Sequence, residues 1–314
     1  MVSISLFGRS LLTLLDFSPE EIQYLLKLAN KVKTEAHKGK IKQRFKGKTL
    51  AMLFEKRSTR TRCSFETAFG EEGGHPVFLS TADIQLGGKE SLEDTARVLG
   101  RMFDAIQFRG FKQETAQILA KYSGVPVYNG LTDLYHPTQA LADLLTLEEN
   151  FGTVKGKVLC YVGDGRNNVA RSLMIICAKL GTHFTVITPP ELNPDDELRG
   201  KITSLAKESG AVIKVTPDIG EVKGADALYT DVWISMGEEE KKEERLRLLS
   251  PYQVNQKMMD MTNKKESIFL HCLPAVKGEE VTADVIDGKQ SKAWDQAENR
   301  KHTIKAVMLA TLIK

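Results

Sequence analysis

The chain is organised around residues 54–74, FEKRSTRTRCSFETAFGEEGG. This stretch leaves an apolar segment that predicts a strand at Thr49–Phe54, and it opens with a strongly basic turn. It continues with Phe65 and Phe69 at helical spacing, which predicts a helix over Arg60–Glu72. A strand, a polar turn and a helix in this order form the repeating unit of parallel α/β sheets.

The basic turn of this stretch suits a phosphate group. Ser58, Thr59, Arg60 and Thr61 follow one another between the strand and the helix. A helix start offers backbone N–H groups and a partial positive charge, and a hydroxyl residue there can cap the helix. Arginine adds a permanent charge and forked donors. A solvated basic turn is the plain alternative, but four such residues in a row favour a phosphate-binding site.

The rest of the chain repeats this alternation in two halves. Further strands are predicted at Pro76–Leu79, Ala105–Phe108, Val125–Tyr128, Val158–Val162, Phe184–Ile187, Val212–Val215, Ala227–Tyr229 and Ile268–His271. Further helices are predicted at Ser91–Met102, Lys112–Tyr122, Pro137–Asn150 and Asn168–Leu180. Residues 152–156, GTVKG, separate the halves, so we expect one domain at 1–150 and a second at 151–300. A closing helix is predicted over His302–Ile313, and residues 301–314 are expected to dock back on the first domain.

The expected fold is therefore α/β, with two doubly wound parallel-sheet domains joined by helices. In such sheets, ligands bind beyond the carboxyl ends of the strands. We expect the active site at these strand ends, in the inter-domain cleft.

Composition limits the classes of partner. The chain has 314 residues, with 44 Lys and Arg and 41 Asp and Glu, so its net charge is +3. This excess is too small to indicate that nucleic acid or an anionic membrane is the main binding partner. The sequence contains no run of about 18 apolar residues, and its mixed N-terminus does not resemble a signal peptide. Cys63, Cys160, Cys177 and Cys272 lack CxxC spacing, which predicts a reduced, cytoplasmic protein without a zinc site. Neither a metal nor another cofactor is expected.

Polar residues gather where the predicted strands of the first half end. Arg109 follows the strand at 105–108, where it can face an anion or form a surface ion pair. His136 and Gln139 stand at the start of the helix that Pro137 opens. A capping or surface histidine is the alternative there, but a Gln one turn further on favours a hydrogen-bonding site.

The second half opens with Gly163-Asp164-Gly165-Arg166-Asn167-Asn168 after a strand. This begins like a dinucleotide fingerprint, G-x-G, but Asn168 stands where the third glycine belongs, and the bulky residues would crowd a pyrophosphate. A nicotinamide site is therefore disfavoured. Asparagine at a helix start suits a small carboxylate instead.

Two further clusters follow strand ends in the second half. Asp231, Ser235 and the flexible Gly237 could hold an ammonium group or form a simple polar loop, and the charged run 238–247 predicts a solvated helix face. His271 and Cys272 are neighbours in a strand, so their side chains should point to opposite faces and not form a nucleophile pair. Arg300 precedes the predicted closing helix and offers one more guanidinium.

These motifs resemble the aspartate/ornithine carbamoyltransferase family. The resemblance is carried by Ser58-Thr59-Arg60-Thr61, Phe108-Arg109-Gly110, Gln85-Leu86-Gly87-Gly88-Lys89-Glu90-Ser91, His136-Pro137-Thr138-Gln139, Asp231 with Ser235-Met236-Gly237, and His271-Cys272-Leu273-Pro274. The STRT and HPxQ elements are shared across the family, whereas the Ser-Met-Gly loop and HCLP are more specific to the ornithine branch. The resemblance extends from about residue 5 to the C-terminus.

The resemblance implies a transferase of arginine metabolism that carbamoylates the δ-amine of L-ornithine from carbamoyl phosphate, giving citrulline and phosphate. It implies that Arg60, His136, Cys272 and Arg300 are catalytic. It implies that carbamoyl phosphate is held by Ser58, Thr59, Arg60, Thr61, Gln85, Arg109, His136, Gln139, Cys272, Leu273 and Arg300, with Gln85 supplied by the neighbouring subunit of a homotrimer. It implies that ornithine is held by Asn168, Asp231, Ser235 and Met236.

Three alternatives to this reading remain at the level of sequence. A related carbamoyltransferase could use putrescine or an acylated ornithine, although Asp231 and the Ser-Met-Gly loop favour a free amino acid. A nicotinamide dehydrogenase is disfavoured by Asn168. A non-catalytic amino-acid-binding protein would have no reason to keep Arg60, Arg109 and His136 together with Gln139.

Overall fold

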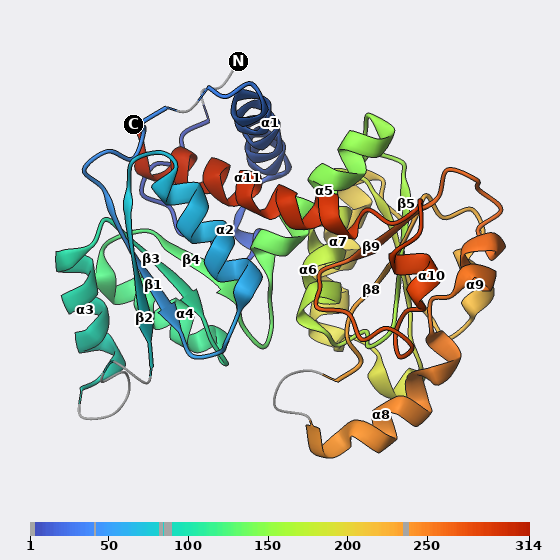
Figure 1. Ribbon diagram of the computed structural model, residues 1–314. Coiled ribbons are helices and arrows are strands. Elements are labelled where there is room, and N and C mark those ends of the chain that lie inside the picture. Colours follow the sequence, from blue (N-terminus) through green and yellow to red (C-terminus); the bar gives the residue numbers. More distant parts are fainter. Residues whose placement is uncertain (1–3, 41, 82–83, 85–89, 235–238) are drawn as a thin grey trace. The chain divides into compact units, whose positions relative to one another are not determined.

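The computed structural model describes residues 4–40, 42–81, 84, 90–234 and 239–314. Its internal contacts divide the chain into two compact units. Unit 1 comprises Met1–Leu145 with Glu298–Lys314, and unit 2 comprises Thr146–Ala297. Each unit contains its own parallel sheet flanked by helices, so the predicted pair of doubly wound α/β domains is confirmed (Figure 1).

Unit 1 is built on a parallel sheet with the strand order β2-β1-β3-β4. Its strands are β1 (Thr49–Phe54), β2 (His75–Ser80), β3 (Ala105–Arg109) and β4 (Val127–Leu131). Its helices are η1 (Leu14–Asp16), α1 (Pro19–His37), α2 (Thr59–Gly70), α3 (Leu92–Met102), α4 (Gln113–Ser123), most of α5 (Pro137–Phe151) and most of α11 (Ala293–Leu312). The chain passes between the units within α5 and within α11.

Local sequence explains the main elements of unit 1. Strands β1 and β3 are almost wholly buried, as expected for inner strands of a parallel sheet covered on both faces, whereas the edge strand β2 is only partly buried. Helix α1 begins with a complete capping box, in which Ser18 and Glu21 exchange side-chain and backbone hydrogen bonds and Pro19 takes the first helical position.

Unit 2 is built on a parallel sheet with the strand order β7-β6-β5-β8-β9. Its strands are β5 (Val158–Val162), β6 (His183–Ile187), β7 (Ile213–Thr216), β8 (Ala227–Thr230) and β9 (Ile268–His271). Its helices are α6 (Asn168–Leu180), η2 (Pro190–Leu192), α7 (Asp196–Ser209), η3 (Ile219–Val222), η4 (Glu239–Lys241), α8 (Lys242–Leu249), η5 (Ser250–Tyr252), α9 (Gln256–Met261) and α10 (Ala283–Ile286). Phe269, Leu228 and Cys160 belong to a core cluster on one side of this sheet.

Each sheet has a point where the order of its strands reverses. In unit 1 this point lies between β1 and β3, and in unit 2 it lies between β5 and β8. Loops that leave adjacent strands at such a point diverge to opposite faces of the sheet and open a crevice for ligands. The polar segments after β1 and β3 therefore share one crevice, and those after β5 and β8 share another.

One expectation about the C-terminal half is wrong. The closing helix begins at Ala293 and not at His302, so Arg300 lies within α11 and not before it. In the charged run, residues 240–244 and Arg247 are exposed, as predicted for a solvated helix face. Arg245 of α8 is the exception, because it is buried and pairs with Asp164.

Two further observations concern membrane-spanning helices and the cysteines. Among the helices of the described residues, none combines the length and the apolar character needed to cross a membrane. Cys63, Cys160, Cys177 and Cys272 are all free thiols, and only Cys63 is exposed.

Gly100 tests the packing of α3 against α4. A Cβ added at Gly100 would lie 1.8 Å from the carbonyl oxygen of Ser123, so Gly100→Ala must push the two helices apart. We expect the free energy of unfolding to fall by roughly 1–3 kcal/mol, the usual cost of overpacking. Denaturation by urea, followed by circular dichroism, measures the change.

The matched control for Gly100 is Gly70→Ala, which is also helical but has no atom within 4 Å of the added Cβ. This variant should be as stable as the parent protein or slightly more stable. Equal stabilities of the two variants would contradict the close approach of α3 and α4.

Candidate active site

The start of α2 forms the first part of the site in unit 1. Ser58 is the N-cap, and its Oγ accepts the backbone N–H of Thr61 at 3.2 Å. This cap fixes the first turn of the helix directly after β1, at the strand-order reversal of the sheet. The N–H groups of a first turn and the helix dipole favour an anion at this position.

The hydroxyl of Thr61 joins two arginines from distant parts of the chain. Thr61 Oγ1 accepts a hydrogen bond from Arg109 Nη1 at 3.0 Å and another from Arg300 Nη2 at 3.0 Å. All three residues are buried. A hydroxyl has two acceptor lone pairs and one proton, so two donated bonds leave its proton for a further acceptor. The cluster thus offers a hydroxyl donor beside two guanidiniums, which suits a phosphate or a developing oxyanion.

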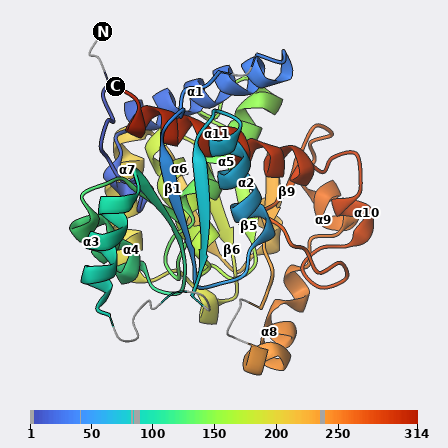
Figure 2. The ribbon, with the colours of Figure 1, turned by 60° about the vertical axis from the view of Figure 1, so that its left-hand side comes forward.

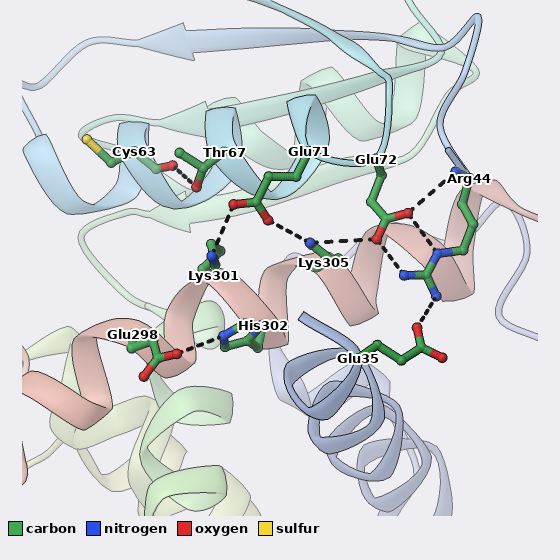
Figure 3. A network of polar contacts seen from close by, with 10 residues as sticks. All are labelled: Glu35, Arg44, Cys63, Thr67, Glu71, Glu72, Glu298, Lys301, His302 and Lys305. Atoms are coloured by element: carbon green, nitrogen blue, oxygen red, sulfur yellow. Dashed lines mark hydrogen bonds and ion pairs between the residues drawn. The ribbon is translucent and has the colours of Figure 1, made fainter. Parts of the chain in front are cut away.

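Ion pairs fix α2 against α11 and so fix Thr61 relative to Arg300. Glu71, next to the end of α2, binds Lys301 at 3.1 Å and Lys305 at 2.9 Å, both from α11 (Figure 3). Glu72 pairs with Arg44 in the same network (Figure 3). Lys305 also lies 3.6 Å from Glu72, and because both side chains are nearly fully buried, solvent screens this pair less than a surface pair.

His136 is a neutral hydrogen-bonding group in this positive environment. Burial, and then the charges of Arg300, Arg109 and Arg60, hold the pKa of its imidazole well below the usual 6.5. Its backbone carbonyl accepts the N–H groups of Gln139 and Ala140 at the start of α5. A neutral imidazole can donate one hydrogen bond to a carbonyl oxygen without first losing a proton.

Gln139 presents an acceptor one turn further along α5. Its Nε2 donates to Asp143 Oδ1 at 2.8 Å, which fixes the orientation of the amide. Its Oε1 is buried and has no hydrogen-bond partner among the described residues. A buried acceptor of this kind is complementary to an N–H group of a ligand.

The structure places the sequence-predicted residues of unit 1 as follows. Thr61, Arg109 and Arg300 share hydrogen bonds, and the charges of Arg60, Arg109 and Arg300 act on His136. Thr59 is exposed at the first position of α2. Gln85 lies outside the described residues.

Asp231 is the centre of the polar cluster in unit 2. Its Oδ1 accepts the Val232 N–H at 2.8 Å and the Cys272 thiol at 2.9 Å, and its Oδ2 accepts Asn167 Nδ2 at 3.0 Å. These donors are neutral, so they orient the carboxylate without cancelling its charge. A buried carboxylate held in this way suits a cationic ligand such as an ammonium group.

Several acidic groups of this region act on Tyr161. Burial first, and then Asp231, Asp164, Cys272 and Glu280, raise the pKa of Tyr161 well above its usual value of 10. Acidic groups that disfavour a phenolate equally favour a bound cation.

Gly165 of the G-x-G segment is closely packed against a neighbouring loop. A Cβ at Gly165 would lie 2.9 Å from the carbonyl oxygen of Leu192 and 3.1 Å from Pro194 Cδ, so the neighbouring loop fills the space. Arg166 folds back onto Asp164, which also accepts the buried Arg245 at 3.1 Å.

The expectation that His271 and Cys272 point apart is wrong. Atoms of Asp231, His271 and Cys272 that could bind a metal ion all lie within 4.8 Å of one another. Strict alternation holds only within a strand, and β9 ends at His271, after which Leu273 has a left-handed φ of 58°. Both imidazole nitrogens of His271 are nevertheless engaged, with Glu280 and with the Leu273 N–H, so the thiol bonds to Asp231 instead.

Sequence reasoning missed several supporting residues of unit 2. Asn167 caps α6 and holds Asp231, and its position before the helix is a recognisable capping signal. No motif in the sequence around Arg245 or Glu280 indicates that these residues support the site. Asn168 is the first residue of α6 and is partly buried, while Ser235 and Met236 lie outside the described residues.

The lowered pKa of His136 predicts a pH dependence of stability. In the unfolded chain this imidazole takes up a proton near pH 6.5, whereas in the folded protein it stays neutral to a much lower pH. The unfolded state therefore binds more protons below pH 6.5, and stability falls on acidification by up to about 1.4 kcal/mol per pH unit from this group.

His136→Asn should flatten this dependence. Unfolding free energies between pH 8 and 5 should fall less steeply in the variant than in the parent protein, whatever their absolute values. Parallel curves would show that His136 titrates normally in the folded state.

Comparison with known proteins places this geometry in a family. Residues 9–149 match the family model "Aspartate/ornithine carbamoyltransferase, carbamoyl-P binding domain", and residues 155–311 match "Aspartate/ornithine carbamoyltransferase, Asp/Orn binding domain". Over 313 residues the chain is 66% identical to an ornithine carbamoyltransferase of Caldanaerobacter subterraneus subsp. tengcongensis and 64% identical to one of Thermotoga maritima. Each alignment covers 99% of this chain and 100% of the relative.

A solved structure gives the same result. The fold is similar to that of ornithine carbamoyltransferase from Pyrococcus furiosus, with a TM-score of 0.94, 48% identity and 99% of both chains covered. The family that the sequence motifs predicted is thus confirmed. The chain belongs to the aspartate/ornithine carbamoyltransferase family.

Proposed function

We propose that this chain transfers the carbamoyl group of carbamoyl phosphate to the δ-amine of L-ornithine, giving L-citrulline and phosphate. Relatives 64–66% identical over nearly their whole length are named ornithine carbamoyltransferase. The observation that carries the proposal is the Thr61 hydroxyl held by two buried arginines beside a neutral His136, because this set is complementary to a phosphate and a developing oxyanion.

In this proposal, residues 1–150 with the end of the chain bind carbamoyl phosphate. The phosphate group is held by Ser58, Thr59, Arg60, Thr61, Arg109 and Gln85, the last from a neighbouring subunit. Arg60, Thr61 and His136 contact the carbamoyl oxygen, and Arg300 lies near this group. Gln139 Oε1 accepts a hydrogen bond from the carbamoyl NH₂, which fits its burial and its lack of a partner within the part of the chain that the structure describes.

Residues 151–300 bind the amino acid. Asn168, Asp231, Ser235 and Met236 hold its α-carboxylate and α-ammonium groups, and the negative surroundings of Asp231 support this assignment. Cys272 lies near the δ-amine, and the carbonyl of Leu273 accepts a second hydrogen bond from the carbamoyl NH₂. Putrescine has no α-carboxylate for Asn168 to hold, so we expect it to bind more weakly than ornithine.

The chemistry requires no covalent enzyme intermediate. The neutral δ-amine attacks the carbamoyl carbon, and the tetrahedral oxyanion forms beside Arg60, Thr61 and His136. The bond between the carbamoyl carbon and the phosphate oxygen then breaks, phosphate leaves into the arginine cluster, and the proton lost by the amine passes to the leaving phosphate. Holding the two reactants together can lower the barrier by roughly 7–11 kcal/mol. A preorganised donor to the oxyanion contributes about 3–4 kcal/mol more.

We also propose a cytoplasmic homotrimer. Val98 and Met102 of α3 are 44% and 69% exposed, and exposed apolar side chains on one helix suit a subunit interface. A neighbouring subunit is also needed for the contribution assigned to Gln85.

The assay that decides the function mixes carbamoyl phosphate with L-ornithine and measures phosphate and ureido product together. We expect equal amounts of both. Putrescine and N-acetylornithine serve as competing acceptors and should give little product. Phosphate without ureido product, or preference for another acceptor, would contradict the proposal.

Two variants test the division of roles. Arg60→Ala should lose carbamoyl phosphate binding and turnover together, because it removes a charge from the anion site. Asp231→Asn should leave carbamoyl phosphate binding intact and weaken ornithine binding at least tenfold. Isothermal calorimetry measures both ligands, and equal damage to both by Asp231→Asn would refute the assignment.

A further inference from the structure

A buried pair of residues surrounds the turn that follows β9. His271 and Glu280 are fully buried, and His271 Nε2 lies 3.1 Å from Glu280 Oε1. His271 Nδ1 accepts the backbone N–H of Leu273 at 2.8 Å. An imidazole nitrogen that accepts a hydrogen bond carries no proton, so the neutral ring donates from Nε2 to the carboxylate. The two contacts fix both the tautomer and the orientation of the ring.

Glu280 also binds the far end of the same turn. Its Oε1 accepts the backbone N–H of Val276 at 2.6 Å, while its backbone carbonyl accepts Val254 N–H at 2.9 Å. The near end is anchored separately, because Gln296 Oε1 accepts the N–H of His271 at 2.9 Å. The segment between His271 and Val276 is thus tied at both ends to one buried carboxylate and an amide.

The turn needs this support because of Leu273. Its φ of 58° is left-handed, a conformation that residues with a branched aliphatic side chain rarely adopt. Such a residue keeps this conformation only where its surroundings determine it. The hydrogen bond to His271 fixes the backbone N–H of Leu273. The carbonyl of the same residue is the group proposed above to accept a hydrogen bond from the carbamoyl NH₂.

We propose that His271, oriented by Glu280, is a positioning residue that fixes the Leu273 carbonyl and the neighbouring Cys272 thiol for the transfer reaction. This inference rests on the proposed function. It assigns His271 no contact with substrate. A buried pair that served only to fill the core would have no need of the specific bond to Leu273.

Variants at His271 that differ in reach test the proposal. Asn can accept the N–H two residues further on, the geometry of an Asx turn, whereas Gln is one methylene longer and cannot keep that bond. We expect His271→Asn to keep kcat within about threefold and His271→Gln to lose about tenfold to a hundredfold, the scale of a small misplacement at a reacting centre. The KM for carbamoyl phosphate should change little, because its phosphate site lies in unit 1.

The conservative variant Glu280→Gln completes the test. Its amide oxygen can still accept from His271 and Val276, so kcat should remain near that of the parent protein. Equal kcat values for His271→Asn and His271→Gln, in folded proteins that bind carbamoyl phosphate, would overturn the positioning role. Lack of ureido product in the parent protein would instead refute the proposed function itself.

A second, independent cluster lies where α1 meets α11. His37 is the last residue of α1, and Glu298 and His302 are one turn apart on α11, which lies beside α1 (Figures 1 and 2). Glu298 Oε1 lies 2.7 Å from His37 Nε2 and 3.2 Å from His302 Nε2. The ligating atoms all lie within 4.8 Å of one another.

We infer that this cluster binds a late first-row divalent cation such as Zn²⁺ or Co²⁺. Two imidazoles and one carboxylate are a common ligand set for these ions. Tetrahedral bonds of about 2.0–2.2 Å place ligand atoms roughly 3.3–3.6 Å apart, so the contacts of 2.7 Å and 3.2 Å must open slightly to admit an ion. His302 is buried, whereas the side chains of His37 and Glu298 are 58% and 41% exposed, so water can complete the coordination.

Neighbouring charges limit the affinity of this site. Lys33 and Lys301 oppose a cation, although Lys33 donates to Asn299 at 2.8 Å and Lys301 pairs with Glu71. His302 Nδ1 has no hydrogen-bond partner among the described residues, and ligating imidazoles usually need one. We therefore expect moderate affinity and release of a proton on binding.

Titration with Co²⁺, followed by its visible absorption, and the thermal shift with Zn²⁺ test this site. A Cys272→Ser background removes thiolate binding at the other cluster. In that background we expect one tetrahedral Co²⁺ signal and a higher Tm with Zn²⁺. His37→Gln should lose both, and His75→Gln, which changes another exposed histidine, should keep both. Unchanged titrations in His37→Gln, or no signal at millimolar metal, would overturn the inference.

Discussion

The site of unit 1 depends on the burial of two guanidiniums against one hydroxyl. Removing a charged group from water is costly unless other groups compensate for the lost hydration. Arg109 and Arg300 are both buried and both donate to Thr61, so two like charges are held together at the strand-order reversal of the sheet. Both guanidiniums would attract an anionic ligand at this point. The ion pairs between Glu71 and α11 hold the cluster in place (Figure 3).

The site of unit 2 has the opposite sign and uses the same architecture. Asp231 follows β8 at the second strand-order reversal, and the donors that hold it are neutral. Parallel sheets bring loops from distant parts of the sequence to the edge where ligands bind. The residues of these loops therefore determine which class of ligand each unit can bind. In one unit these loops carry arginine and hydroxyl groups, and in the other they carry a carboxylate and amides. The pair suits one anionic and one cationic reactant.

The neutral state of His136 shows how these charges tune a polar group. Three arginines surround an imidazole that burial already disfavours as a cation. The group is thereby reserved as a hydrogen-bond donor and cannot act as a proton reservoir near neutral pH. This agrees with a reaction in which positioning and electrostatic stabilisation carry the catalysis.

The sequence alone determined the two α/β halves, most strand positions and the motifs at the strand ends, because each rests on local periodicity or on the chemistry of a few adjacent residues. Thr49–Phe54 and Asn168–Leu180 fall where their patterns predict. The cap of α2 by Ser58 is likewise local. Only the tertiary structure decided that Arg300 meets Thr61 across 239 positions, that Arg245 is buried against Asp164, and that Glu280 orients His271. Such contacts depend on which strands lie side by side and on how helices cover them, and no short stretch of sequence carries that information.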